Sequence, residues 1–557
     1  MPIASFSIRS RVVVAVLSPV FAAGLRAQCE IATLVSPTPF PGKAYGASLA
    51  ATENELVVGS WKDGVTTYVR SAGPSALDLL DDTWVEQDHL EWISPNDAFG
   101  YSVSLLGDIL VVGAPGDIWT VPHVHVYRRE AGALAGDPAD DTWIEQAVLN
   151  DDPVYGYSQQ FGHRVLATDG QLFVSAIGAT PPVTPKDWSF GAVYVFGQDD
   201  GGTPGDLADD AWLPADVLLA PPAVWFGEYF GWSLALIGDH LLVGHVGFGF
   251  TAATGNVHDY RRDDPGTPAD PSDDLWVLHT DLVPQTDSVL DVFGYSLAAD
   301  GDRLLVAARE SAFEFRLDDH GTPADPSDDT WEQMAELLTE PELQADAGVA
   351  LRGDVALIGN VSGYVLPPAG AAFFRRQADG TWQQVAQLSA PNGSENFGEA
   401  VALTKDVAFT GDRGLWYALP PDETKGFVIA TALVATPWSY VDSALAGSAG
   451  EPVLFGAGAL TAGEPLVLTL DKAAPVSSGL LIYGATVVNL PAFGGLLVPS
   501  PDRVAAFATD AAGMLALTAE WPAGLPAGFA LYVQAWVADA GAPQGWAASN
   551  ALGLVAP

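Results

Sequence analysis

Aspartates recur in three acidic segments of similar sequence, and carboxylates grouped in this way could bind a metal ion. Each segment has aspartate at positions 1, 8 and 12, and a tryptophan follows two residues after the last aspartate. Carboxylate oxygens on a loop rich in glycine and proline are the hard ligands that Ca²⁺ prefers. The candidate calcium ligands are Asp199, Asp206 and Asp210 in the first segment, Asp263, Asp270 and Asp274 in the second, and Asp318, Asp325 and Asp329 in the third.

The same segments can also be explained as solvated extensions of β-hairpins. In a shorter copy, Asp379-Gly380 stands just before Thr381-Trp382, and Asp-Gly is the expected two-residue turn of a hairpin. Related acidic stretches end at Asp82 and Asp141, again two residues before a tryptophan. Aspartate also caps turns through its own backbone. The sequence therefore leaves two interpretations open, calcium ligands or hairpin caps.

Other motifs of enzyme chemistry are absent from the sequence. It has no Gly-x-Ser-x-Gly elbow, no His-Glu-x-x-His and no phosphate-binding loop. Cys29 is the only cysteine, which excludes an intramolecular disulfide and a cysteine-based metal site. A carboxylate pair for glycoside hydrolysis stays open, because 69 aspartates and glutamates always offer some pair.

A repeat of the form Phe/Tyr-Gly-x-Ser/Ala-hydrophobic provides the elements that must position these loops. Its glycines are Gly46, Gly100, Gly162, Gly231, Gly294, Gly348 and Gly398. A second small residue follows 13 positions later in six copies and 11 positions later in the copy at Gly348, which has lost its aromatic residue. This near-constant distance predicts two strands joined by a short turn, with a length fixed by the pairing register.

Two more strands complete the repeat. A third, usually aromatic, strand is expected at 124–129, 192–196, 257–262, 312–316 and 371–376. A fourth strand begins at a tryptophan and ends at a leucine: Trp84–Leu90, Trp143–Leu149, Trp212–Leu219, Trp276–Leu282, Trp331–Leu338 and Trp382–Leu388. Four short antiparallel strands with an aromatic residue and a glycine at fixed places are typical of a propeller blade.

These residues resemble the FG-GAP repeat of integrin α subunits and of many bacterial secreted proteins, over roughly residues 29–425. The resemblance implies a β-propeller, and Gly113-Ala114-Pro115 is its most complete second half. FG-GAP propellers often bind Ca²⁺ in loops patterned Asp-x-Asp-x-Asp-Gly-x-x-Asp. The acidic segments of this chain depart from that pattern and lie in a different hairpin.

We therefore predict an all-β protein, with a seven-bladed β-propeller over residues 28–425 and a small C-terminal β-sandwich over residues 436–557. The last copy is expected to supply three strands over 397–418. The segment Cys29–Leu34 is expected to be the fourth strand and to close the ring, and Phe427–Leu433 is a rival for that place. Closure would hide sheet edges that otherwise aggregate.

The N-terminus and the charge indicate where the protein works. Arg9 and Arg11 precede an apolar run from Val12 to Leu25, which predicts a signal peptide over residues 1–27 and a location that is secreted or at the cell surface. No later stretch is long and apolar enough to span a membrane. The net charge of −46 disfavours nucleic acid as a partner and favours cations.

The sequence thus predicts a monomeric, non-enzymatic binding or adhesion protein. Its propeller loops would be presented to an extracellular protein or glycan, with Ca²⁺ in the acidic hairpin loops. One alternative is an extracellular hydrolase that acts on a polymer through carboxylates facing the propeller channel. Another is a structural component of the cell envelope.

Overall fold

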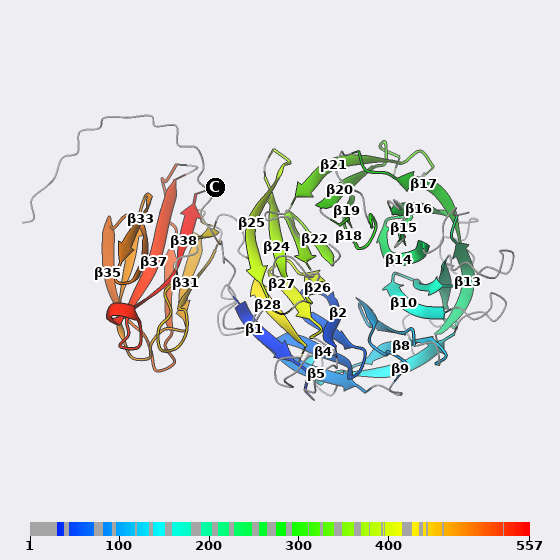
Figure 1. Ribbon diagram of the computed structural model, residues 1–557, viewed down its shortest axis with the longest axis horizontal. Helices are drawn as coiled ribbons and strands as arrows, with labels where there is room; N and C mark the ends of the chain where they lie inside the picture. The colour runs from blue at the N-terminus through cyan, green and yellow to red at the C-terminus, as the bar shows by residue number, and fades with distance from the viewer. Residues whose placement is uncertain are drawn as a thin grey trace, which may run out of the picture.

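The computed structural model describes residues 30–556 with internal gaps, the longest of which are 72–81, 151–158, 180–190, 264–273, 339–347, 361–368 and 415–425. Within these described residues, seven four-stranded antiparallel sheets stand around one axis and form a β-propeller (Figure 1). The predicted all-β class and the seven blades are therefore confirmed. The predicted signal peptide lies outside the described residues.

In each of the first six blades the chain passes from the innermost strand to the outermost one. Blade 1 contains β2 (Tyr45–Ala51), β3 (Glu55–Ser60), β4 (Gly64–Ser71) and β5 (Thr83–Leu90). Blade 2 contains β6 (Ser102–Leu106), β7 (Ile109–Ala114), β8 (His123–Glu130) and β9 (Thr142–Leu149), with a short 3₁₀ helix at Pro138–Asp140. Blade 3 contains β10 (Gln159–Ala167), β11 (Gln171–Gly178), β12 (Ala192–Asp199) and β13 (Ala211–Leu219).

The other blades follow the same order. Blade 4 contains β14 (Glu228–Ile237), β15 (His240–Gly247), β16 (Asn256–Asp263) and β17 (Leu275–Leu282). Blade 5 contains β18 (Leu297–Asp300), β19 (Arg303–Ala307), β20 (Ser311–Asp318) and β21 (Thr330–Leu338). Blade 6 contains β22 (Val349–Arg352), β23 (Val355–Asn360), β24 (Gly370–Arg376) and β25 (Trp382–Ser389). Blade 7 contains β26 (Phe397–Leu403), β27 (Val407–Asp412), β28 (Phe427–Ala432) and β1 (Glu30–Val35).

The repeated residues hold neighbouring blades together. Phe99 is fully buried and packs with Val57 and Val65 of the preceding blade. Ser102 Oγ donates a hydrogen bond to the carbonyl oxygen of Gly162 in the next blade, at 2.8 Å. The Phe-Gly-x-Ser pattern therefore records contacts between blades; it is complete in blades 2, 4 and 5 and altered at one or more positions in the others.

The strand that closes the ring comes from the N-terminal end of the described chain. β1 pairs antiparallel with β28, with Leu34 opposite Val428 and Val35 opposite Phe427. The N-terminal segment therefore occupies the fourth position of blade 7. The third strand was predicted wrongly: it is β28, at Phe427–Ala432, and not a strand inside 397–418. Both rival segments belong to blade 7, and the propeller extends past residue 425.

Further sheets form after the propeller. A five-stranded sheet, in the order β29-β38-β37-β32-β35, faces a three-stranded sheet, in the order β30-β31-β36, across one hydrophobic core. Their bounds are β29 (Trp438–Val441), β30 (Val453–Ala457), β31 (Pro465–Asp471), β32 (Ser478–Gly484), β35 (Arg503–Ala508), β36 (Leu515–Glu520), β37 (Ala530–Ala538) and β38 (Trp546–Val555). A hairpin of β33 (Val487–Ala492) and β34 (Gly495–Pro499) and a 3₁₀ helix at Pro543–Gly545 complete this part. Among the described residues, no helix has the length and apolar character needed to cross a membrane.

Candidate functional site

In blades 1 to 4 the last aspartate of the acidic hairpin pairs with the side chain twelve residues before it, near the end of the third strand. The shortest distances between these partners are 2.5 Å for Arg70–Asp82 and 2.6 Å for Arg262–Asp274, and Gln198 donates to Asp210 in the same way. The side chain of Asp274 is fully buried. A buried carboxylate needs such a partner to offset its lost hydration. Asp210 and Asp274, two of the predicted calcium ligands, are thus part of the scaffold of their blades.

The first aspartate of each hairpin lies where the third strand ends. Asp199 Oδ1 accepts a hydrogen bond from the backbone N–H of Gly201 at 3.2 Å, and Asp318 Oδ1 accepts one from the N–H of His320 at 3.0 Å. These contacts are the turn-capping bonds that aspartate makes with its own backbone. Asp263 is exposed at the end of β16.

Calcium binding stays a prediction. The middle aspartates Asp206, Asp270 and Asp325 lie outside the described residues. Among the residues that are described, no three histidine, cysteine, aspartate or glutamate side chains are placed to hold a metal ion together. In blades 3 and 4 the last aspartates, Asp210 and Asp274, already bond to residues of the scaffold.

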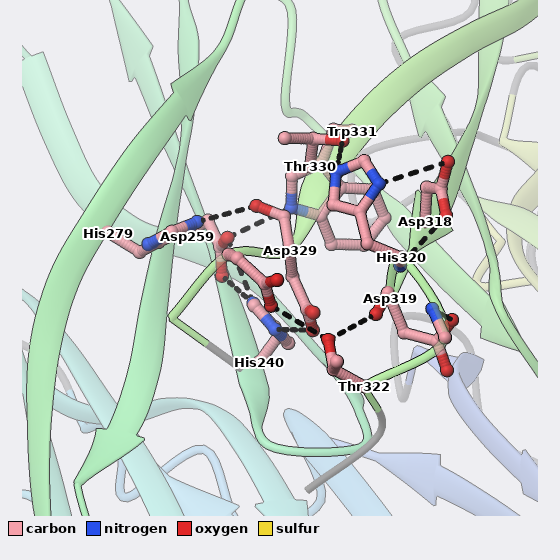
Figure 2. A network of polar contacts seen from close by, with 12 residues as sticks. His240, Asp259, His279, Asp318, Asp319, His320, Thr322, Asp329, Thr330 and Trp331 are labelled. Atoms are coloured by element: carbon pink, nitrogen blue, oxygen red, sulfur yellow. Dashed lines mark hydrogen bonds and ion pairs between the residues drawn. The ribbon is translucent and has the colours of Figure 1, made fainter. Parts of the chain in front are cut away.

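In blade 5 the corresponding aspartate bonds to the neighbouring blade. Leu317 stands where other blades have arginine or glutamine, and Asp329 Oδ2 lies 2.9 Å from His240 Nε2 of blade 4 (Figure 2). His240 Nδ1 lies 3.0 Å from both carboxylate oxygens of Asp259, and Trp331 Nε1 donates to Asp259 Oδ2 at 2.9 Å. His240 is 1% exposed and Asp259 is 0% exposed. A buried polar network therefore joins blades 4 and 5.

This network makes the stability of the propeller depend on pH. Burial lowers the pKa of His240, but the hydrogen bonds and charges of Asp259 and Asp329 outweigh burial, and the pKa is raised. The other groups that face this imidazole are the Trp331 indole and the His279 ring, whose centroid is 5.7 Å away. Because the pKa in the folded protein exceeds the unfolded value of about 6.5, the stabilisation is complete below that pH and is lost as pH rises through the folded pKa.

We expect the thermal unfolding midpoint of the parent protein to fall as the pH is raised from about 6 to about 9. We expect the midpoint of His240→Gln to fall less over this range. Differential scanning calorimetry of both proteins measures this difference in slope. His320→Gln is the control, because His320 is exposed in the blade 5 hairpin and should keep the slope of the parent protein. Equal slopes in the parent and His240→Gln would contradict the prediction.

The two ends of the propeller carry different groups. The first and third strands of a blade run in the same direction, so the acidic hairpins lie at the end where the inner strand finishes. The residues that begin an inner strand and those that follow a second strand lie at the opposite end. We call the first end the hairpin face and the second the axial face.

Five aromatic side chains from successive blades follow one another on the axial face. Four occupy the variable position directly after the repeat glycine, and the first follows β3: they are Trp61, Tyr101, His163, Trp232 and Tyr295. Successive ring centroids are 5.2, 5.2, 4.8 and 5.4 Å apart. We call these five residues the axial arc. It curves around the propeller axis, because the inner strands that carry it surround that axis (Figure 1).

Two guanidinium groups and one carboxylate adjoin the arc. Arg164 Cζ lies 6.0 Å from the ring centroid of Tyr101, and Arg413 Cζ lies 5.5 Å from that of Trp61. Both positions are within reach of a cation–π interaction. Arg413 Nε also lies 2.7 Å from Glu399 Oε2. An arginine at position 164 is specific to blade 3, since the other copies of the repeat have serine or alanine there.

Burial sets the protonation of the arc and leaves two of its nitrogen atoms without hydrogen bonds. His163 is 2% exposed, and burial together with the nearby Arg164 lowers the pKa of His163 well below its ordinary value, so the ring is neutral. His163 Nε2 lies 3.4 Å from the Tyr101 hydroxyl. Among the described residues, His163 Nδ1 and Trp61 Nε1 have no hydrogen-bond partner. Such buried atoms are costly, so each can gain from a bond to a bound molecule.

Comparison with known proteins identifies the repeat. Residues 93–123, which include Phe99-Gly100 and Gly113-Ala114-Pro115, match the model of the FG-GAP repeat. This stretch of the chain is therefore similar to an FG-GAP repeat. In it, the residue after Gly100 is Tyr101 of the axial arc, so the arc is built on the variable position of the repeat. No curated protein matches the chain in sequence.

Solved structures that are similar in part include a β-propeller domain. The crystal structure of the β-propeller domain of Cps50 (Swd1) from Myceliophteria thermophila aligns over 72% of this chain and 100% of that domain, with 12% sequence identity and a TM-score of 0.40. At these values the likeness carries no argument about function.

Proposed function

We propose that the protein is a non-enzymatic binding protein, secreted or at the cell surface, that recognises an extracellular protein or glycan through the axial face of its FG-GAP propeller. The axial arc is the observation that supports this function. Aromatic rings present a large and rigid contact area at a small cost in conformational entropy, and they dominate many binding sites. Trp232 and Tyr295 are only partly buried, so their rings remain accessible.

Charge complementarity also favours the axial face over the hairpin face. The hairpin face carries many of the exposed aspartates of a chain whose net charge is −46, which repels anionic partners. The axial arc instead adjoins Arg164 and Arg413, and Glu399 of blade 7 forms an ion pair with Arg413. A ligand at the axial face would therefore meet the aromatic rings of the axial arc and two arginines together.

The test compares two aromatic substitutions in the full mature chain. Trp232→Ala removes a ring of the axial arc, whereas Phe493→Ala removes a ring that is 53% exposed in the C-terminal part. Both proteins and the parent are applied to a glycan array and to immobilised extracellular proteins, once with Ca²⁺ and once with EDTA. We expect Trp232→Ala alone to lose its signals, by at least about tenfold, since hot-spot aromatics are worth about 2 kcal/mol or more. Signals that survive Trp232→Ala and disappear in Phe493→Ala would overturn the proposal.

The EDTA arm tests the calcium prediction separately. If Ca²⁺ orders the acidic hairpins, EDTA lowers the unfolding temperature, because a ligand that binds only the folded state stabilises it. Equal unfolding temperatures with and without EDTA would remove calcium from the function.

A hydrolase remains the second candidate because of one carboxyl group. Burial raises the pKa of Glu399, although Arg413 and Arg164 oppose this shift. A carboxyl group with a raised pKa beside the propeller axis is a suitable general acid. If the protein releases sugars from a polysaccharide and Glu399→Gln abolishes the release, the binding-only function is wrong.

A further inference from the structure

Arg164 is an unusual residue in this strongly acidic chain. Its Nη1 donates to the backbone oxygen of His163 at 3.0 Å, and its guanidinium lies by the Tyr101 ring. In the part of the chain that the structure describes, no carboxylate forms an ion pair with Arg164. By contrast, Arg70 and Arg262 each lie within 2.6 Å of an aspartate oxygen. Arg128, Arg261 and Arg503 also form no ion pair among the described residues, and Arg164 differs from them because its guanidinium lies by a ring of the axial arc.

A second guanidinium group, that of Arg413, lies by the same row of aromatic rings as Arg164. Arg413 acts on the same part of the site, since both arginines lower the pKa of Tyr101 against the effect of burial. Glu399 forms an ion pair with Arg413, and Asp412 also interacts with Arg413, whereas Arg164 forms no ion pair among the described residues. Guanidinium groups pair with carboxylates through charge-assisted hydrogen bonds, and the partly desolvated surroundings strengthen such a pair.

The rest of the axial arc leads away from the arginines and is uncharged. Trp232 lies between His163 and Tyr295, with ring centroids 4.8 and 5.4 Å away. His163 Nδ1, which is buried and unpartnered among the described residues, lies in this row. A ligand that fits here needs a carboxylate at one end, a ring with an apolar face beside it, and hydroxyl groups that bond to the imidazole nitrogen.

The geometry points to a site for an acidic saccharide, of the uronic acid class, on the axial face. The carboxylate binds Arg164, the sugar ring packs on Trp232 and Tyr295, and a hydroxyl group bonds to His163 Nδ1. This assignment rests on the proposed binding function and names its ligand class. Aromatic surface with a few fixed polar groups is the usual composition of a small-molecule site.

Other anionic ligands fit less well. A nucleic acid carries many phosphates and would be repelled by the acidic remainder of the surface. An acidic peptide offers carboxylates but no ring of hydroxyl groups for the unpartnered imidazole nitrogen, so it is an outcome of the test and not the proposal.

The test uses a matched pair of probes, trigalacturonate and its methyl ester, which differ in charge but share the same rings. Binding to the full mature chain is measured by isothermal titration calorimetry. We expect the parent protein to prefer the acid by about tenfold or more, since hydrogen bonds to charged groups contribute about 1.5–3 kcal/mol. Arg164→Gln should bind the two probes about equally, and Trp232→Ala should lose both.

Arg352→Gln is the control, because Arg352 is an arginine on the hairpin face with its side chain 50% exposed and its partner Glu53 at 2.7 Å. It should keep the preference of the parent protein, and unfolding temperatures verify that each variant is folded. The proposal is wrong if Arg164→Gln keeps the preference or if the parent binds the ester as tightly as the acid. It is also wrong if the only ligand whose binding is weakened by Trp232→Ala is an acidic peptide, poly-glutamate. In that case the proposed binding function still stands. If Trp232→Ala binds every tested ligand as the parent protein does, both proposals fail.

Discussion

A protein that begins at residue 38 is expected to be less stable by roughly 3 kcal/mol than one that begins at residue 28. The truncation removes β1, and with it the side chain of Leu34, which is 8% exposed. It also exposes the edge of β28, whose backbone pairs with β1 from Phe427 to Thr431. An exposed edge can pair with other chains, so the truncated protein should also aggregate more readily.

Thermal unfolding and light scattering measure the two effects. The protein that begins at residue 28 is the matched control, because it retains all of β1. Adding a synthetic peptide of residues 29–37 should restore part of the lost stability to the truncated chain. If the truncated protein unfolds at the same temperature as the control, β1 does not close the ring.

Gly113→Ala is expected to destabilise the propeller by ~3 kcal/mol, because it forces two blades apart. A β-carbon at Gly113 would lie 2.1 Å from the backbone oxygen of Gly162 and 2.3 Å from Ser102 Oγ. Neither the backbone of blade 3 nor the buried serine that donates to it can move without breaking the contact between blades. Chemical denaturation measures the difference in the free energy of unfolding, provided that its slope against denaturant concentration is the same for both proteins.

Gly107→Ala in the same blade is the control for loss of a glycine. Gly107 has a φ of +55° and nothing within 4 Å of the added β-carbon, so only the backbone conformation is penalised. That penalty is about 1–2 kcal/mol. A smaller effect for Gly113→Ala than for Gly107→Ala would mean that the close approach of the blades is not rigid.

Much of the propeller could be predicted because its contacts between blades require particular residues. A small residue is needed where Gly113 meets Gly162, and Ser48, Ser102 and Ser233 each donate to the repeat glycine of the next blade, so these residue types recur at a fixed distance in the sequence. The third strand of blade 7 could not be found in this way. It ends in alanine at Ala432, without the terminal arginine of Val257–Arg262, and residues 413–426 separate it from β27.

The role of the aspartate before each tryptophan could be predicted from the sequence, but only from the spacing between two positions. Arg70 and Asp82 are twelve residues apart, as are Arg262 and Asp274, and their shared spacing is that of partners across a hairpin. The network at His240 could not be predicted, because it joins strands from two blades whose side-chain register depends on the packed structure.

The axial arc was harder to predict from the sequence than the contacts between blades. Tyr101, His163, Trp232 and Tyr295 occupy the one position of the repeat that the propeller leaves variable, and in four successive copies that position is aromatic. Trp61 and Arg413 follow second strands and have no counterpart in the repeat pattern, so only the structure brings them to the same end.

The position of β1 also determines the order in which the protein can be completed. Glu30 pairs with Thr431, so the earliest-made strand must wait for the last-made blade. At 5–20 residues per second, the wait lasts roughly 20–80 s for a chain emerging from the ribosome. During this time the segment has no partner within its own molecule. At high local concentration it can pair with the open blade 7 of another copy, which would link two chains by exchange of identical strands.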